Sequence, residues 1–288
     1  MVQNKDNFLG KHRPLIRRMS WLAGTLLSLI FLTSCGSGET NENAGKTDTG
    51  NQLRPQIAEG LKLTHDKKFN EAKTKVYELI HKNRNDAEAI SIMSYIFLKS
   101  NALSKASDMA ERALKIDPFL FRPYIVLARI NFQVSGFDKA LDLSRQALVI
   151  NPEAFEAYQI IGEIYLRRGL TKAAVTVLKE AVRLDSENPK LLNFLASGYI
   201  KDKQYDQAMS TLITLQEINS NIPGAHFNLA VVYAKMKDGH KAMRHITKAE
   251  KLYALEKNKI WLGKTRDIRR VIAKDFKFRP EDINEGDL

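Results

Sequence analysis

The sequence predicts an all-α fold, a right-handed α-solenoid of six helix–turn–helix units followed by a C-terminal capping helix. The first observation is a period of 34 residues, which is marked by six alanines: Ala72, Ala106, Ala140, Ala174, Ala208 and Ala242. A fixed period of this length is typical of stacked helix pairs, in which each unit packs only against its neighbours. Two further observations, a second set of small residues and a set of helix-stopping residues, fall in the same phase.

The period divides residues 53–256 into six units. These are 53–86, 87–120, 121–154, 155–188, 189–222 and 223–256. The eighth position of every unit is small: Gly60, Ser94, Ala128, Gly162, Ala196 and Ala230. The periodic alanines occupy the twentieth position, so both helices of a unit carry a small residue. Because two helices approach closely only where side chains are short, positions 8 and 20 are expected to let the two helices of a unit come close together.

Helix-stopping residues close most units at positions 31 and 32. They are Asp117-Pro118, Asn151-Pro152, Asp185-Ser186 and Asn219-Ser220. Proline cannot continue a helix, and aspartate or asparagine tolerates the turn that follows one. We therefore expect the second helix of a unit to end just before these residues.

This register resembles the tetratricopeptide repeat family over residues 53–256. The first unit departs most, because Gln56 and Glu59 stand where large apolar residues are usual and Arg84 replaces a proline. A polar outer face is what a capping repeat needs, so the departure fits the position of this unit at the end of the array. The resemblance implies a scaffold that binds partners in a concave groove, lined by the first helix of each unit.

The amino terminus, residues 1–34, has the features of a lipoprotein signal peptide. Basic residues precede an uncharged, mostly apolar run from Met19 to Thr33. The sequence Leu32-Thr33-Ser34-Cys35 resembles a bacterial lipobox, which implies that Cys35 is lipidated and becomes the first residue of the mature chain. Cys35 is the only cysteine, so no disulfide can form within the chain. An uncleaved membrane anchor is the alternative, although the apolar run is shorter than the roughly 20 residues of a spanning helix.

Residues 35–52 are expected to form a flexible tether, because the segment after Cys35 is polar and small. Residues 257–279 are expected to form a basic capping helix, with nine lysines and arginines against two aspartates. Five of its apolar residues are expected to share one face at helical spacing: Ile260, Trp261, Ile268, Val271 and Ile272. The last residues, 280–288, carry four acids and are expected to be frayed.

Composition and motifs argue against several classes of function. The net charge is +12, but much of it lies in the leader and the capping helix, and no nucleic-acid motif is present. Acidic lipid headgroups or an acidic protein suit the basic helix better than nucleic acid does. No two of the six histidines have the four-residue spacing of a helical metal site, and no nucleophile elbow or phosphate loop occurs. We therefore expect no enzyme, no metal site, no small-molecule substrate and no cofactor beyond the lipid on Cys35.

The groove positions implied by the resemblance carry an apolar stripe beside a ladder of cations. The stripe consists of Tyr95, Leu98, Phe132, Leu166, Ile200 and Phe227. The ladder consists of Lys99, Arg129, Arg167, Lys201 and Lys235. Exposed apolar surface flanked by charge usually marks a protein interface, so the expected partner is a protein with apolar and acidic segments. In the alternative interpretation, part of the stripe packs between units and the cations only keep the groove soluble.

The expected function is that of a lipid-anchored adaptor at the cell envelope, on the outer membrane and facing the periplasm if the organism has one. Two alternatives remain open. Six repeats behind a lipobox resemble the outer-membrane lipoproteins that help type IV pilus secretins to assemble. An adaptor for another outer-membrane or cell-wall assembly complex is the other alternative. The sequence does not identify the partner.

Overall fold

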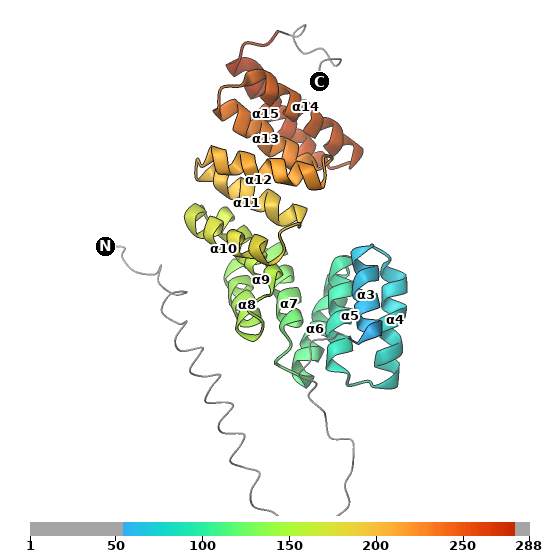
Figure 1. The fold of residues 1–288 in the computed structure, drawn as a ribbon. Helices are drawn as coiled ribbons and strands as arrows, with labels where there is room; N and C mark the ends of the chain where they lie inside the picture. Colours follow the sequence, from blue (N-terminus) through green and yellow to red (C-terminus); the bar gives the residue numbers. More distant parts are fainter. Residues whose placement is uncertain (1–53, 280–288) are drawn as a thin grey trace, which may run out of the picture. The chain divides into compact units, whose positions relative to one another are not determined.

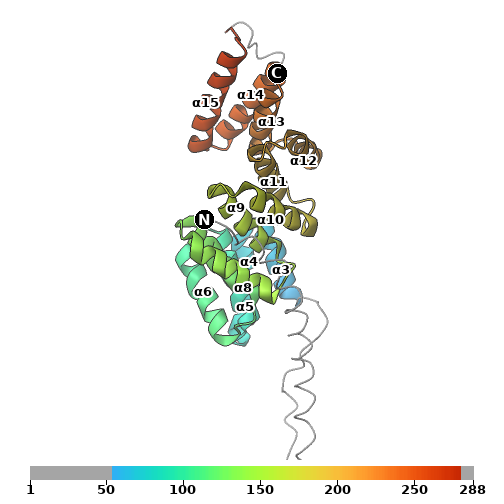
Figure 2. The same cartoon turned by 90° about the vertical axis from the view of Figure 1, so that its left-hand side faces the viewer.

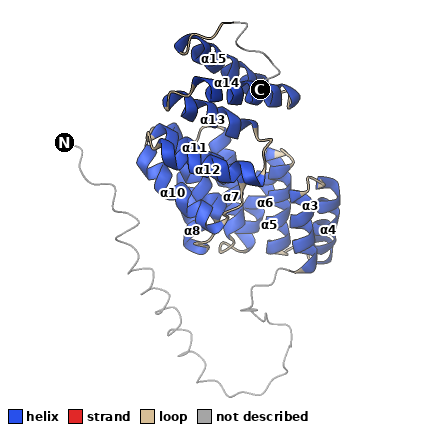
Figure 3. Cartoon of the chain, turned by 45° about the horizontal axis from the view of Figure 1, so that its top comes forward, coloured by secondary structure: helices blue, strands red, loops and turns tan. Residues whose placement is uncertain are grey.

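A computed structural model describes residues 54–279, which form a succession of α-helices (Figure 1). The helices are α3 Pro55–His65, α4 Phe69–Lys82, α5 Ala87–Lys99, α6 Leu103–Ile116, α7 Phe121–Gln133, α8 Phe137–Ile150, α9 Phe155–Arg167, α10 Thr171–Leu184, α11 Pro189–Lys201, α12 Tyr205–Ile218, α13 Pro223–Lys235, α14 Gly239–Leu255 and α15 Lys259–Asp275. Within residues 54–279 there is no strand (Figure 3). Among the same residues, no helix has the length and apolar character needed to cross a membrane. The expected leader, lipid-attachment residue Cys35, tether and tail lie outside the described residues.

The helices pack as six consecutive pairs, from α3 with α4 to α13 with α14, and α15 packs against α14 (Figure 2). The first helices of successive pairs also pack against one another, from α3 with α5 to α11 with α13. In the described part of the chain, the second helices make no mutual contact of similar extent. The first helices therefore line the inner surface of the array. The predicted all-α solenoid of stacked helix pairs is confirmed.

The second helices end at the predicted stop residues, and the structure shows why. Helices α6, α8 and α12 are followed by Asp117, Asn151 and Asn219. In each case the side-chain oxygen accepts a hydrogen bond from the backbone N–H two residues later, at 2.8–3.0 Å. This Asx turn gives the backbone an alternative to continuing the helix. The chain can then reverse direction into the first helix of the next unit.

The turn inside each unit contains a residue in the left-handed backbone conformation, always at position 15. These residues are Lys67, Asn101, Ser135, Gly169, Lys203 and Lys237, with φ between 60° and 72°. The N–H of the following residue donates to the carbonyl of position 11, as Ala102 does to Phe97 at 2.8 Å. This hydrogen bond closes a helix in a Schellman motif. Of the six, only Gly169 adopts the conformation without a steric penalty from a Cβ atom.

Lys203→Gly is expected to raise the free energy of unfolding by about 1 kcal/mol, because glycine removes the Cβ penalty of the left-handed turn. Gly169→Ala should lower it by a similar amount. A Cβ on Gly169 would meet no atom within 4 Å, so the alanine variant tests the backbone alone. Chemical denaturation of both variants measures the effect. A destabilised Lys203→Gly protein would contradict the role assigned to this turn.

Small side chains at positions 8 and 20 let the two helices of a unit touch. All six alanines at position 20 are fully buried. A Cβ added to Gly162 would lie 2.5 Å from Cγ of Leu178, and one added to Gly60 would lie 2.7 Å from Cγ2 of Val76. Both distances are too short for real atoms. Gly60 and Gly162 therefore allow contacts that any other residue would obstruct.

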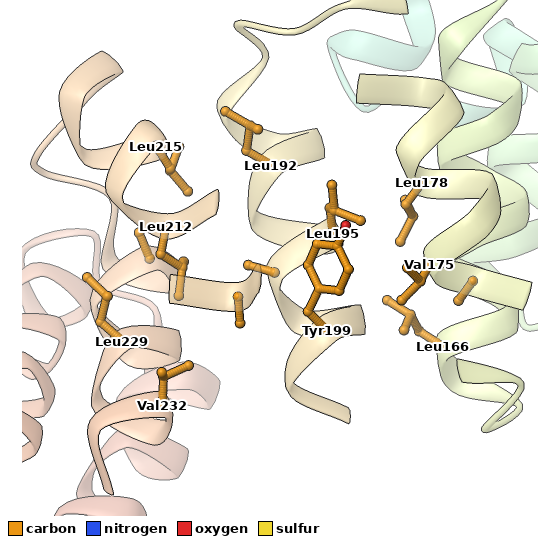
Figure 4. Close-up of a cluster of buried hydrophobic side chains, with 14 residues drawn as sticks. Leu166, Val175, Leu178, Leu192, Leu195, Tyr199, Leu212, Leu215, Leu229 and Val232 are labelled. Atoms are coloured by element: carbon orange, nitrogen blue, oxygen red, sulfur yellow. The ribbon is translucent and has the colours of Figure 1, made fainter. Parts of the chain in front are cut away.

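Buried side chains also join one unit to the next. In the cluster of Figure 4, Leu195 and Tyr199 of α11 lie between Val175 of α10 and Leu212 of α12. Tyr199 occupies the eleventh position of its unit and fills space between neighbouring units. The core is thus continuous across three units in this part of the array.

The capping helix α15 divides its apolar residues between two faces, so the prediction of a single shared face is wrong. Ile272 is buried and Ile268 packs beside it in a cluster with α14. Ile260 and Val271 instead leave 73% and 52% of their surface exposed. Ile260 and Val271 are eleven residues apart, so they lie on the same side of α15, about three turns from each other. That side is about 100° around the helix axis from the side that carries Ile272.

Candidate partner-binding groove

The groove positions lie on helices α5, α7, α9, α11 and α13, and their side chains differ widely in exposure. Four cations are exposed: Lys99, Arg167, Lys201 and Lys235. Five residues are half-buried: Tyr95, Leu98, Arg129, Ile200 and Phe227. The remaining two, Phe132 and Leu166, are only 7% exposed. The apolar stripe is therefore interrupted at its centre.

Phe132 and Leu166 pack between units, which corrects their assignment to an exposed stripe. Phe132 belongs to the core cluster of units three and four and lies 5.8 Å from the ring of Phe137. The guanidinium groups of Arg129 and Arg167 cover its ring, at 5.4 and 4.7 Å from the ring centre. Leu166 packs in the cluster of Figure 4. For these two residues the alternative interpretation, packing between units, holds.

Several of the predicted cations also have partners inside the protein. The ammonium group of Lys201 donates to the backbone carbonyl of Leu166 at 3.0 Å. The guanidinium of Arg129 donates to a carboxylate oxygen of Glu163 at 2.9 Å. The ammonium group of Lys99 lies 4.9 Å from the ring centre of Tyr95. The ladder therefore contributes to the scaffold as well as to the charge of the groove.

A polar network lies below this surface. Its buried members were not among the predicted groove residues. Glu163 accepts a hydrogen bond from Gln159 at 2.7 Å, and both side chains are buried. Glu163 and its partner Arg129 both occupy position 9, in successive units. Because equivalent positions in neighbouring units lie side by side, opposite charges 34 residues apart were a signal for this ion pair.

A second polar contact continues the network along α11 and α13. The side-chain amide of Asn228 donates to Asn193 at 2.9 Å and to Ser197 at 3.1 Å. Asn228 is buried, and the other two residues are half-buried. The inner surface of the array thus has a floor of fixed hydrogen-bonding groups beneath its cations.

Positive charge concentrates at the middle of the groove around Lys99 and Lys190. Desolvation by the surrounding protein lowers the pKa of Lys99, and the positive charge of Arg129 lowers it further. Desolvation likewise lowers the pKa of Lys190, with further contributions from Arg129 and Lys99. Both lysines are nevertheless exposed to solvent. Lys190 was not among the predicted groove residues.

Glu156 and Glu163 supply negative charge close to this centre. Glu156 raises the pKa of Lys99 and Glu163 raises that of Lys190, although neither outweighs desolvation. Since Glu163 is buried and paired with Arg129, it is not available to a ligand. The accessible charge at the centre of the groove is therefore mainly positive.

The structure also brings together two histidines that no sequence spacing connects. Nδ1 of His226 on α13 lies 2.9 Å from Nδ1 of His245 on α14. Nε2 of His226 lies 2.9 Å from the backbone carbonyl of Ser220, and the ring of His245 stacks on Tyr233. Within residues 54–279, no group of three or more histidine, cysteine, aspartate or glutamate side chains is placed to hold a metal ion.

Residues 165–223 match the family model described as tetratricopeptide repeat. This part of the chain is therefore similar to tetratricopeptide repeats. The match spans the end of α9, all of α10–α12 and the first residue of α13, where the described helices keep the same 34-residue register. No curated protein sequence matches the chain.

Solved structures with the same fold share little sequence with this chain. The anaphase-promoting complex assembly Cut9–Hcn1 has a chain with a TM-score of 0.63 and 17% identity, over 73% of this chain and 41% of that one. The chain thus spans about two fifths of that relative. The structure of pilF from Pseudomonas aeruginosa gives a TM-score of 0.58 and 14% identity, covering 74% of this chain and 95% of that one. MamA from Desulfovibrio magneticus RS-1 gives a TM-score of 0.50 and 17% identity, covering 60% of this chain and 96% of that one.

Proteins with tetratricopeptide repeats, which residues 165–223 match, typically bind protein or peptide partners. Here the repeats place cations, half-buried aromatic rings and fixed amide groups on one inner surface. This combination suits the side chains and backbone of a peptide.

Proposed function

We propose that this protein is a lipid-anchored adaptor whose groove binds a protein segment with acidic and apolar side chains. The observation that carries the proposal is the pair of exposed cations Lys99 and Lys190, whose ammonium groups lie 4.9 and 5.9 Å from the ring centres of the half-buried Tyr95 and Phe194. A desolvated ammonium group has lost part of its hydration. A carboxylate that binds it therefore gains more electrostatic free energy than it would at an open surface.

Aromatic rings beside the two lysines support an apolar component in the ligand. Tyr95 lies next to Lys99 on α5, and Phe194 lies one helical turn from Lys190 on α11. Both rings are half-buried, so each still presents surface to a partner. Aromatic side chains of this kind often act as anchors at protein interfaces. Acidic residues flanking an apolar residue would match this arrangement.

The groove proposal is tested by removing its central charge. Lys99→Gln combined with Lys190→Gln is expected to reduce the recovery of a cross-linked partner from native membranes at least about tenfold, because two groove charges are lost. Lys139→Gln with Lys179→Gln makes the same change on exposed second-helix positions and should leave recovery unchanged. Equal recovery with both double variants would place the binding surface elsewhere. Phe132→Glu with Leu166→Glu is unsuitable, because it would bury two carboxylates.

The lipid anchor is proposed from the lipobox-like sequence that ends at Cys35. Cys35→Ala is expected to abolish incorporation of labelled palmitate and to release the protein from the membrane fraction, since several acyl chains are needed for stable attachment. Metabolic labelling and fractionation measure the two effects. Persistent labelling of the variant would refute lipid attachment at this residue. Attachment to an outer membrane, on its periplasmic face, is part of the same proposal and is tested by separating the membranes.

A second candidate function is assembly of a type IV pilus secretin. The combination of a lipobox-like sequence and six repeats favours it, and the pilF structure shares the fold over 95% of its own length. Deletion of the gene should then cause secretin monomers to accumulate in place of multimers. Unchanged multimers would favour an adaptor for another outer-membrane or cell-wall complex.

A further inference from the structure

The turn between α14 and α15 presents two apolar side chains directly to solvent. Leu255, the last residue of α14, is 78% exposed, and Ile260, at the start of α15, is 73% exposed. A turn of three residues separates the two helices, so both side chains project from the same end of the helix pair. Phe119 and Val149 are similarly exposed, but only at this turn, in the described part of the chain, do two large apolar side chains more than 70% exposed lie within six residues of each other.

Lysines flank the two apolar side chains on the same turn. Lys257 and Lys259 are both exposed, and neither forms an ion pair with any described residue. Arg266 and Arg269 both contact Glu250, at 2.8 and 3.0 Å, so one of their two charges is balanced within the protein. Lys257 and Lys259 therefore place unpaired positive charge next to the exposed apolar groups, against the single exposed acid of the turn, Glu256.

The surrounding residues carry a strong excess of the same charge. Residues 239–279 contain thirteen lysines and arginines against four acids, whereas residues 54–238 contain 26 against 21. An array whose other units are nearly balanced thus ends in a strongly basic helix pair. Basic residues beside exposed apolar side chains are the chemistry that binds the interface of an anionic membrane.

We propose that the α14–α15 turn docks on an anionic phospholipid membrane. Leu255 and Ile260 enter the boundary between headgroups and acyl chains, and Lys257 and Lys259 contact the lipid phosphates. This docking requires neither the groove nor lipid attachment at Cys35. The basic end of the array would then bind a ligand different from the partner in the groove.

Trp261 provides a reporter at the docking surface. The chain has two tryptophans, Trp21 and Trp261, so a protein consisting of residues 53–288 has Trp261 alone. This segment forms a separate contact unit and contains all four hydrophobic cores. Trp261 follows Ile260 directly, is 38% exposed and stacks on Tyr253 at 5.8 Å. Its emission therefore reports on the environment of this turn.

Residues 53–288 are expected to sediment with vesicles that mix phosphatidylglycerol with phosphatidylcholine, but not with pure phosphatidylcholine vesicles. Tryptophan emission should shift to shorter wavelength on binding, and added salt should weaken binding because the lysine contacts are screened. Lys257→Glu with Lys259→Glu is expected to reduce the partition coefficient at least about tenfold. Leu255→Ser with Ile260→Ser should reduce it and abolish the shift in emission.

Matched controls test whether losing any positive charge, or any exposed apolar side chain, weakens binding to vesicles. Lys139→Glu with Lys179→Glu makes the same charge change on α8 and α10, and Val149→Ser removes an apolar side chain that is 77% exposed on α8. Both controls should bind like the unmodified protein. If they weaken binding as much as the turn variants do, the proposal is overturned. A dimer in sedimentation without a vesicle-dependent shift would also overturn it, in favour of a second copy of the chain.

Discussion

Acidification from neutral pH to about pH 4 is expected to destabilise the last repeat by roughly 1–3 kcal/mol through His245, because solvent screens part of the effect at this half-buried ring. Desolvation lowers the pKa of His245 from 6.5 to about 4, with smaller contributions from the cost of placing a second positive charge beside His226 and from the charges of Arg244 and Lys248. Desolvation, followed by Lys248, lowers the pKa of His226 as well. In this pH range the unfolded chain therefore binds more protons than the folded chain. The stability of the fold with neutral His245 is therefore fully present above pH 6.5 and is lost as the pH falls towards 4.

The hydrogen bonds of the pair fix the tautomer of His226 and oppose protonation of its Nδ1, whereas for His245 desolvation is the main cause of the lowered pKa. The carbonyl of Ser220 can only accept, so Nε2 of His226 carries the hydrogen and donates to it. Nδ1 of the neutral His226 then accepts a hydrogen bond from Nδ1–H of His245. A proton on Nδ1 of His226 would set two N–H groups against each other and break this contact.

Chemical denaturation at a series of pH values measures the effect. His245→Phe removes the titrating group and keeps a ring that can stack on Tyr233, so its stability should change less between neutral pH and pH 4. His65→Gln is the control, because its side chain is 94% exposed and lies in the first unit. If His245→Phe retained the full pH dependence of the unmodified protein, the destabilisation would have to arise from other groups.

Ala174→Leu is expected to lower the free energy of unfolding by about 1–3 kcal/mol. Ala174 is fully buried on α10, in the fourth unit, where Gly162 lets α9 pack closely. The larger side chain would force the two helices apart or push neighbouring side chains out of their preferred rotamers. Because the helix pairs share cores, the effect should extend to the contact with α11.

Thermal and chemical denaturation of Ala174→Leu are compared with Lys179→Leu. Lys179 lies on the same helix and is exposed, so leucine there adds an apolar side chain without overpacking the core. Its stability should stay within about 0.5 kcal/mol of that of the unmodified protein. A neutral Ala174→Leu variant would show that position 20 is not the contact between the two helices.

The parts of the fold that depend on small or helix-stopping residues were predictable from the sequence. Close contact demands small side chains, so positions 8 and 20 carry a compositional signal in every unit. The left-handed turn at position 15 carries almost none, since only Gly169 there is a glycine. The Schellman hydrogen bond fixes that conformation even where lysine or serine occupies the position.

The side of each first helix that faces the inner surface was predictable, but the exposure of individual residues on it was not. The register shows which side of a helix a residue occupies, but not how far the next unit covers it. Phe132 and Leu166 look like groove residues by register, yet neighbouring side chains bury them. The proximity of His226 and His245 depends on how α13 crosses α14, which no spacing along one helix reveals. Such features require the packing of helices to be known.

The polar contacts between repeats have a consequence for how the chain could acquire its structure. The ion pair between Arg129 and Glu163 spans 34 residues, and the hydrogen bond from Asn228 to Asn193 spans 35. A chain that left an export channel amino terminus first would complete each of these contacts within about one repeat of its appearance. Mostly local contacts of this kind favour fast folding. Under our proposal of a secreted lipoprotein, the array could therefore fold progressively during export.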